Sequence, residues 1–340
     1  MTQYSALRTG RKPIERNLAM ELVRVTEAAA LSAVQHMGKG DKTLVDQAAV
    51  DAMRHTLEGI KMDGIVVIGE GEKDEAPMLY NGERIGDGSE PKVDIAVDPI
   101  DGTTLLSKGL PGAIAVIAMA SQGMMKVARE VFYMDKIAVG PEARDVIDID
   151  APVADNLQKI ARALGRKVTE VTVVMLDRPR HADLLQDVRA AGARVKMISD
   201  GDVAAGIQAA LPDSGVDVLM GVGGTPEGVI TAAALRCTGG AILCKPWPRD
   251  DDERRKAQET GLDLTHVYTT EELVGGEDVF FAATGASSGE LLKGVEFTAG
   301  GATSQSLVMR SRSGTIRWID AIHDFRRLDK VRYTDESGTK

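Results

Sequence analysis

Close to residue 100 the chain reads Val97-Asp-Pro-Ile-Asp-Gly-Thr-Thr104. An apolar run from Val93 to Val97 precedes this stretch and predicts a strand that carries Asp98 at its end. A proline turns the chain, Asp101 follows, and Gly102-Thr103 is expected to open a helix whose free amides can hold a phosphate. The stretch therefore predicts two carboxylates and an anion-binding turn at the end of one strand.

Two further segments place carboxylates after predicted strands, where a sheet presents side chains to a crevice. They are Ile68-Gly-Glu-Gly-Glu-Lys-Asp74 and Gly221-Val-Gly-Gly-Thr-Pro-Glu-Gly228. Taken singly, each acidic segment could be a surface turn or a solvated hairpin. Together they predict a cation site, because gathered carboxylates repel one another unless a positive charge lies between them, and hard oxygen ligands favour Mg²⁺ or Mn²⁺.

The composition excludes several classes of protein. The 340 residues are 43% hydrophobic, which is enough for two domains, and 51 acidic against 41 basic residues argue against nucleic-acid binding. No apolar run is long enough to span a membrane, and the polar, basic N-terminus does not resemble a secretory signal, so we expect a cytoplasmic protein. The two cysteines, Cys237 and Cys244, have no second pair or histidine at ligand spacing and are expected to be reduced thiols.

The hydrophobic pattern changes along the chain. Residues 17–38 and 43–59 are predicted helices, the first with Asn17 as its N-cap, and short apolar runs at 65–68, 93–97 and 113–120 are predicted strands. After residue 150, strands and helices alternate, which predicts parallel crossover connections. Strands are expected at 168–176, 194–198, 216–220, 280–283 and 306–310, and helices at 181–191, 203–211 and 226–236. We divide the chain into a metal-binding domain (1–155), a substrate-binding domain (156–330) and a tail (331–340).

The loop from Gly221 to Gly228 also follows a strand and precedes a helix, as in dinucleotide-binding proteins. The glycine fingerprint of those proteins requires a third glycine at position 226, which is Pro226 here. A nucleotide-binding α/β module is thus the alternative from a different functional class, and it leaves the acidic segments unexplained.

At this point the segments can be compared with a known family. The Asp98 to Thr103 stretch resembles the metal-binding motif of the lithium-sensitive phosphatase superfamily, which includes inositol monophosphatases and fructose bisphosphatases. Further segments resemble class II fructose-1,6-bisphosphatase, over about residues 15 to 325: Gly40-Asp-Lys42 with Asp46, Ile68 to Glu72 running into Asp74 to Tyr80, Arg178-Pro-Arg-His181, Asp200-Gly-Asp202 and Gly223 to Gly228.

The resemblance implies an α-β-α-β-α sandwich of the sugar-phosphatase type and hydrolysis of the C1 phosphate of fructose 1,6-bisphosphate, a step of gluconeogenesis. It implies Mg²⁺ or Mn²⁺ at two or more sites, a sugar bisphosphate as the small-molecule partner, and a homo-oligomer of two or four chains. Sedoheptulose 1,7-bisphosphatase and inositol-monophosphatase-like activity remain alternatives. A monophosphatase does not need a second phosphate-binding site, for which Arg178 and Arg180 are candidates.

The resemblance also assigns roles to individual residues. One divalent ion matches Asp46 and Glu70, and a second matches Asp98, Asp101 and Glu227, although the family often has glutamate where this chain has Asp101. The reacting phosphate matches Asp101, Gly102 and Thr103. The remaining substrate contacts match Tyr133, Arg178, Pro179, Arg180, Asp200, Gly201, Asp202 and Gly224.

Catalytic roles in the implied mechanism fall to four residues. Glu70 or Asp74 is the candidate base for the attacking water, and the choice between them stays open. Thr103 is expected to orient the phosphate or the water. Lys42 is expected to steady the carboxylates or the leaving charge.

Overall fold

The strands of the chain form two sheets in a computed structural model that describes residues 17–71 and 78–328. The first sheet contains β1 (Asp63–Ile68), β2 (Arg84–Ile85), β3 (Lys92–Asp101), β4 (Ile114–Ser121), β11 (Phe280–Gly285), β12 (Glu296–Thr298), β13 (Gly301–Arg310) and β14 (Thr315–Asp324). The second contains β5 (Tyr133–Val139), β6 (Thr172–Leu176), β7 (Arg194–Ile198), β8 (Val218–Gly224), β9 (Ala241–Trp247) and β10 (Tyr268–Thr269). The spatial orders are β12-β13-β11-β4-β3-β1-β2, with β14 paired to β13, and β10-β9-β5-β8-β6-β7.

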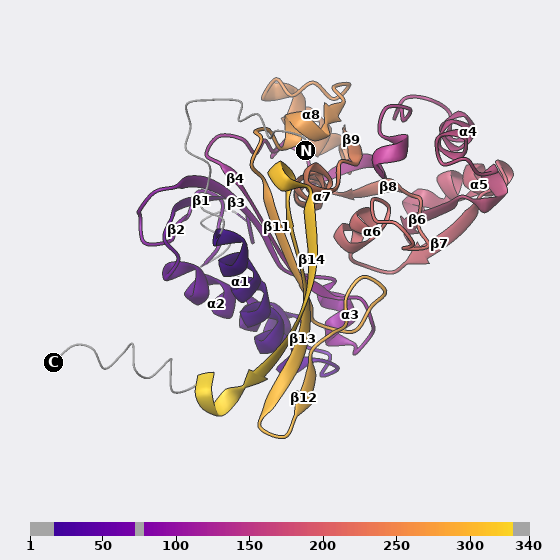
Figure 1. Cartoon of the computed structure of the whole chain (residues 1–340). Coiled ribbons are helices and arrows are strands. Elements are labelled where there is room, and N and C mark those ends of the chain that lie inside the picture. Colours follow the sequence, from indigo (N-terminus) through magenta and orange to yellow (C-terminus); the bar gives the residue numbers. More distant parts are fainter. Residues whose placement is uncertain (1–16, 72–77, 329–340) are drawn as a thin grey trace, which may run out of the picture.

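Helices cover both sheets and separate them. They are α1 (Leu18–Ala33), α2 (Lys42–Glu58), α3 (Thr103–Ser107), α4 (Val153–Ala163), α5 (Ala182–Ala190), α6 (Asp202–Gln208), α7 (Thr225–Thr238), α8 (Asp251–Glu259) and α9 (Thr270–Leu273). Figure 1 shows α1 and α2 against the first sheet, and α4 and α5 beside the second sheet on the far side of the molecule. Among the residues in these described ranges, no helix has the length and apolar character that a membrane crossing requires.

Three apolar cores hold the layers together, because side chains alternate between the two faces of each strand. In β3, Ile95 packs with α1 and α2, whereas its neighbour Ala96 packs toward α7. In β5, Ile137 packs with α4 and α5, whereas Ala138 joins the core around α7. Helix α7 is buried on nearly all sides, as expected for a helix between two sheets. The predicted α-β-α-β-α sandwich is confirmed.

Most predicted elements lie within a few residues of their expected bounds. The first helix is α1 followed by one 3₁₀ turn, although the Asn17 side chain makes no capping hydrogen bond. In contrast, Asp41 caps α2 by accepting from the Leu44 amide at 3.0 Å. The predicted strand at 168–176 begins only at Thr172, because residues 168–170 form a 3₁₀ turn.

The parallel pattern predicted after residue 150 holds for β6, β7 and β8, because β6 is parallel to both of the others. The second sheet is nevertheless mixed, because β5, which precedes that region and was not predicted, pairs antiparallel with β8 and β9. The strands of each sheet come from both sides of the predicted domain boundary at 155/156. Strand β5 precedes that boundary and belongs to the second sheet, while β11 to β14 follow it and return to the first. A hydrophobic pattern predicts a strand but not its partner, so it could not show these long-range pairings.

Both cysteines lie in the core between the sheets. Cys237 on α7 and Cys244 on β9 are free and buried. Burial raises the pKa of the Cys244 thiol to about 12 and moves the pKa of Cys237 upward as well. The thiolate is the reactive form, so burial keeps both thiols protonated and unreactive at pH 8.

Native protein should therefore not react with Ellman's reagent at pH 8 over an hour, whereas protein unfolded in guanidinium chloride should release two equivalents of thionitrobenzoate per chain. Absorbance at 412 nm measures both reactions. Rapid labelling of the native protein would contradict the burial of the two thiols.

Candidate functional site

A cavity of about 600 Å³ lies where β3, β8 and the first turns of α3, α6 and α7 meet between the two sheets. Residues from both sheets contribute to its wall. The predicted site residues that line it are Lys42, Asp46, Glu70, Asp98, Asp101, Gly102, Thr103, Tyr133, Arg178, Arg180, Asp200, Gly201, Asp202, Gly224 and Glu227. Pro179 is exposed and does not line the cavity, and Asp74 lies outside the described residues.

Three carboxylates, those of Asp98 and Asp101 on β3 and of Glu227 on α7, lie close together in one wall of the cavity. Burial raises the pKa of Asp98 well above its ordinary value, and the charges of Asp101, Glu227, Glu70 and Asp46 raise it further. Asp101 is shifted in the same direction by burial, Asp202 and Glu227, although the Ala204 amide donates to it at 3.4 Å. These shifts show that the fold brings together negative charges that repel one another.

Asp46 and Glu70 form a second acidic pair beside this group. Asp46 lies one turn into α2, and Glu70 follows β1. Burial is the main cause that raises the pKa of Glu70 to about 8, and the neighbouring Asp46 charge and a hydrogen bond between the two side chains add to it. The pair therefore retains a shared proton at neutral pH unless a cation takes its place.

The donor set fits a divalent cation. The described lining supplies seven carboxylates and no thiol or imidazole, and oxygen ligands of this kind suit Mg²⁺ and Mn²⁺. One buried oxygen of Glu227, Oε2, has no hydrogen-bond partner, as expected for an atom that binds an ion. Within the described ranges no three acidic, histidine or cysteine side chains already have the arrangement of a metal site, so binding would require these side chains to turn toward the ion.

Glycines make room for the carboxylates. Gly224 ends β8 just before Glu227, and a Cβ at this position would lie 1.9 Å from the Glu227 Oε2. Gly201 adopts φ +77°, and a Cβ there would lie 3.3 Å from Asp101. Gly102, with φ +89°, provides the left-handed residue that starts α3 directly after β3. The predicted glycine positions thus have a steric reason as well as a place in the cavity wall.

Two arginines line the side of the cavity formed by the second sheet. Arg178 donates to the Ser199 carbonyl at 2.6 Å and pairs with Asp200 at 3.3 Å. Arg180 donates to the Val222 carbonyl at 2.8 Å, with its guanidinium 4.6 Å from the centre of the Tyr133 ring. The structure therefore brings both predicted phosphate-binding side chains into the same cavity as the acidic wall.

His181 holds this turn in place and was quoted in the sequence only as part of a motif. The Val222 amide donates to its Nε2 at 2.7 Å, so Nδ1 carries the proton and donates to the Leu176 carbonyl at 2.7 Å. Arg180 and His181 thus contact the carbonyl and the amide of the same residue. The buried, neutral histidine fixes the Arg178 to Arg180 turn against β8.

Sequence reasoning missed Lys136, whose buried ammonium donates to Asp202 at 2.8 Å. A signal was present in the sequence. Lys136 lies two residues from each of the apolar residues Met134 and Ala138 along β5, so it points to the same inward face of the sheet as they do. Strand β5 was not predicted, so that alternation was not used.

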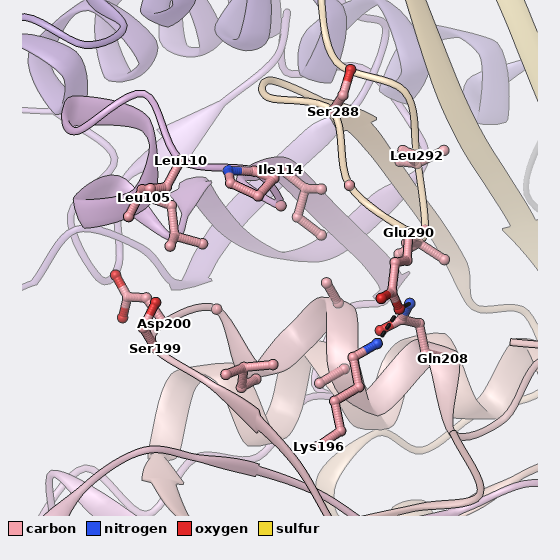
Figure 2. Close-up of a pocket in the computed structure, with 18 of the residues that line it drawn as sticks. Leu105, Leu110, Ile114, Lys196, Ser199, Asp200, Gln208, Ser288, Glu290 and Leu292 are labelled. Atoms are coloured by element: carbon pink, nitrogen blue, oxygen red, sulfur yellow. Dashed lines mark hydrogen bonds and ion pairs between the residues drawn. The ribbon is translucent and has the colours of Figure 1, made fainter. Parts of the chain in front are cut away.

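A second cavity, of about 500 Å³, lies beside the first and shares Asp200 and Gly201 with it. Figure 2 shows leucine and isoleucine side chains along it and the contacts of Glu290 with Lys196 and Gln208 at one end. Its mainly apolar lining does not offer the charges that a sugar bisphosphate requires. The acidic cavity is therefore the candidate site for the expected phosphate chemistry.

Comparison with known proteins identifies the family. A profile described as bacterial fructose-1,6-bisphosphatase, glpX-encoded, matches residues 16–323. The chain belongs to this bisphosphatase family. Two proteins named D-fructose 1,6-bisphosphatase class 2/sedoheptulose 1,7-bisphosphatase are each 44% identical to it across 91% of this chain and 96% of their own. They come from Synechococcus sp. strain JA-3-3Ab and Thermosynechococcus vestitus, and the predicted resemblance is confirmed.

Solved structures give a weaker similarity than the bisphosphatase sequences do. The extragenic suppressor protein SuhB of Bartonella henselae aligns over 57% of this chain and 71% of its own, with 14% identity and a TM-score of 0.32. A similarity this low carries no argument about the fold.

Replacing Gly224 by alanine should displace the Glu227 carboxylate, because the added Cβ overlaps it. We expect hydrolysis of fructose 1,6-bisphosphate, the reaction for which the family is named, to fall about a hundredfold. The matched control is Gly59→Ala at the end of α2, where a Cβ meets nothing within 4 Å. Phosphate release at equal protein concentration measures both variants, and equal rates would show that Glu227 does not need its present position.

Proposed function

We propose that this chain hydrolyses the C1 phosphate ester of fructose 1,6-bisphosphate to fructose 6-phosphate and inorganic phosphate with Mg²⁺ or Mn²⁺. One observation carries the proposal: an acidic wall and a pair of arginines face the same cavity. The acidic wall is suited to cations that accept the reacting phosphate, and the arginines are suited to a second phosphate on the same molecule. The names of the 44% identical relatives support the same reaction.

The metal ligands in this proposal are five of the carboxylates that line the cavity. Asp46 and Glu70 would hold one ion, and Asp98, Asp101 and Glu227 would hold another, Asp101 being a shorter side chain than the glutamate common in the family. Bound divalent ions supply positive charge to the phosphate oxygens and lower the pKa of a water molecule. Because the carboxylates are buried and repel one another, the site is prepared for cations before substrate arrives.

The attacking water needs a base and a group that orients it. Glu70 already shares a proton with Asp46 and is one candidate base; Asp74 is the other. The Thr103 hydroxyl donates to the Ile100 carbonyl at 3.0 Å, so its oxygen is left with the capacity to accept a hydrogen bond. This favours orientation of the water by Thr103. Lys42, at the start of α2, offers a positive charge near the leaving group.

The substrate would bind with its distal phosphate between Arg178 and Arg180. Pro179 would keep the two side chains at a fixed spacing, and Tyr133 packs against the Arg180 guanidinium. Asp200 and Asp202 would accept hydrogen bonds from sugar hydroxyl groups, with backbone groups of Gly201 and Gly224 nearby. Gly102 and Thr103 line the cavity next to Asp101, where the reacting phosphate would lie.

Sedoheptulose 1,7-bisphosphate is the second candidate substrate, because the relatives carry both activities in their names. It has two terminal phosphates as well, and one more carbon changes only the distance between them. Inositol monophosphate lacks the second phosphate and leaves the arginines unused. The cytoplasmic location, the homo-oligomer and the division into domains stay predictions.

The test is a panel of phosphate esters assayed for phosphate release with malachite green, with 1 mM Mn²⁺, with Mg²⁺ and with EDTA. We expect rapid release from fructose 1,6-bisphosphate, little from fructose 6-phosphate or inositol 1-phosphate, and none with EDTA. Activity that persists after chelation, or a preference for the monophosphates, would contradict the proposal. Sedoheptulose 1,7-bisphosphate in the same panel decides the second candidate.

Asp98→Asn should separate stability from catalysis. Removal of a buried charge that its neighbours repel should raise the melting temperature of the metal-free protein, whereas phosphate release at saturating Mn²⁺ should fall by at least about a hundredfold. Calorimetry of the chelated protein and the malachite-green assay measure the two effects. A near-normal rate in this variant would remove Asp98 from the metal site.

A further inference from the structure

Lys136 lies in the middle of the second sheet and has only 2% of its surface exposed. It shares a strand face with Met134 and Ala138, which pack in the core between the two sheets. Its side chain therefore points into the central layer, where α6 and α7 begin. A buried ammonium is unfavourable unless it is paired, so its partners explain its presence.

The direct partner of Lys136 is Asp202, the first residue of α6. The Nζ donates to Oδ2 at 2.8 Å, and the exposed fractions of the two side chains are 1% and 7%. Burial alone would lower the pKa of Lys136, but the charges of Asp202 and Glu227 reverse the direction and raise it. The ammonium therefore keeps its charge, and the contact is a buried ion pair.

The neighbouring backbone leaves space for this pair. A Cβ at Gly223 would lie 2.0 Å from the Asp202 Oδ2 and 2.8 Å from the Lys136 Nζ. A Cβ at Gly228 would lie 3.4 Å from the Lys136 Cε. Gly223 lies at the end of β8 and Gly228 in the first turn of α7, so the same strand-to-helix junction that carries Glu227 also accommodates the lysine.

Lys136 acts on the cavity without lining it. Asp202 and Glu227 form part of the cavity wall, and Lys136 lies behind them. Asp202 in turn raises the pKa of both Asp101 and Glu227 by its negative charge. The lysine thus offsets one of the charges in an acidic wall and fixes the carboxylate that bears it.

We propose that Lys136 is a positioning residue that holds the Asp202 carboxylate toward the sugar hydroxyl groups and offsets its charge beside Asp101 and Glu227. The inference rests on the proposed function, because Asp202 contacts the sugar only in that proposal. Lys136 forms and breaks no bond in the reaction; the one hydrogen-bonded partner of its ammonium among the described residues is Asp202, and its charge also works against the rise that burial causes in the pKa of Glu227.

The test is a double-mutant cycle of Lys136→Met and Asp202→Asn, singly and together. Calorimetry with fructose 6-phosphate gives the Kd, and phosphate release from fructose 1,6-bisphosphate at saturating Mn²⁺ gives KM and kcat. The matched control is Lys245→Met on the adjacent strand β9, where the lysine pairs with Asp150 outside the cavity.

Each single variant should raise both Kd and KM about tenfold with a smaller change in kcat. The Kd and KM of the double variant should not exceed the higher values found for the two single variants. Lys245→Met should bind as the wild type does. A wild-type Kd and KM in Lys136→Met, or losses that multiply in the double variant, would reduce Lys136 to a structural role.

If Lys136→Met does not fold, the double variant still tests the inference. The double variant removes both buried charges, and it should then match Asp202→Asn in Kd and KM; weaker binding than Asp202→Asn would overturn the inference. The activity of the wild type separates the two proposals. If the wild type releases no phosphate from fructose 1,6-bisphosphate, the proposed function is wrong. If the wild type is active and Lys136→Met has the same Kd and KM, only the inference about Lys136 is wrong.

Discussion

Electrostatic repulsion among buried carboxylates is the constraint on which the rest of this structure depends. Asp46, Glu70, Asp98, Asp101 and Glu227 come from segments as far apart as α2 and α7, and the fold withdraws them from water in one cavity wall. The pKa of each is raised. Such a group is unfavourable for folding, so the surrounding layers must overcome it, and a cation relieves it.

The five layers explain how the repulsion is tolerated. Helix α7 is buried between the two sheets and carries Glu227 in its first turn, while β3 ends with Asp101 in the same acidic wall of the cavity. Apolar packing on both faces of each sheet fixes these two elements. The site therefore lies where the two halves of the sandwich meet, and neither sheet contains it alone.

The sequence predicted helices α1, α2, α5, α6 and α7 and the strands with strong apolar runs, because hydrophobic periodicity and turn chemistry are local. Fifteen of the seventeen predicted site residues line the cavity. It could not predict that β5 pairs with β8 and β9, or that β11 returns to the first sheet, because strand partners are set by long-range packing. Lys136 was missed for the same reason: a lysine in an unpredicted strand has no assigned face. Arg180 and His181 were found as a motif, but their shared contact with Val222 appears only in the fold.

The order of strands in the first sheet has a consequence for synthesis of the chain. Strand β11, at residues 280–285, pairs with β4 on one side and with β13 on the other. While the nascent polypeptide emerges from the ribosome, β4 has an open edge until more than 150 further residues have been translated, and open edges invite pairing with other chains. The intervening residues 133–269 supply the whole second sheet, so the ribosome completes that sheet before it delivers the segment that closes the first.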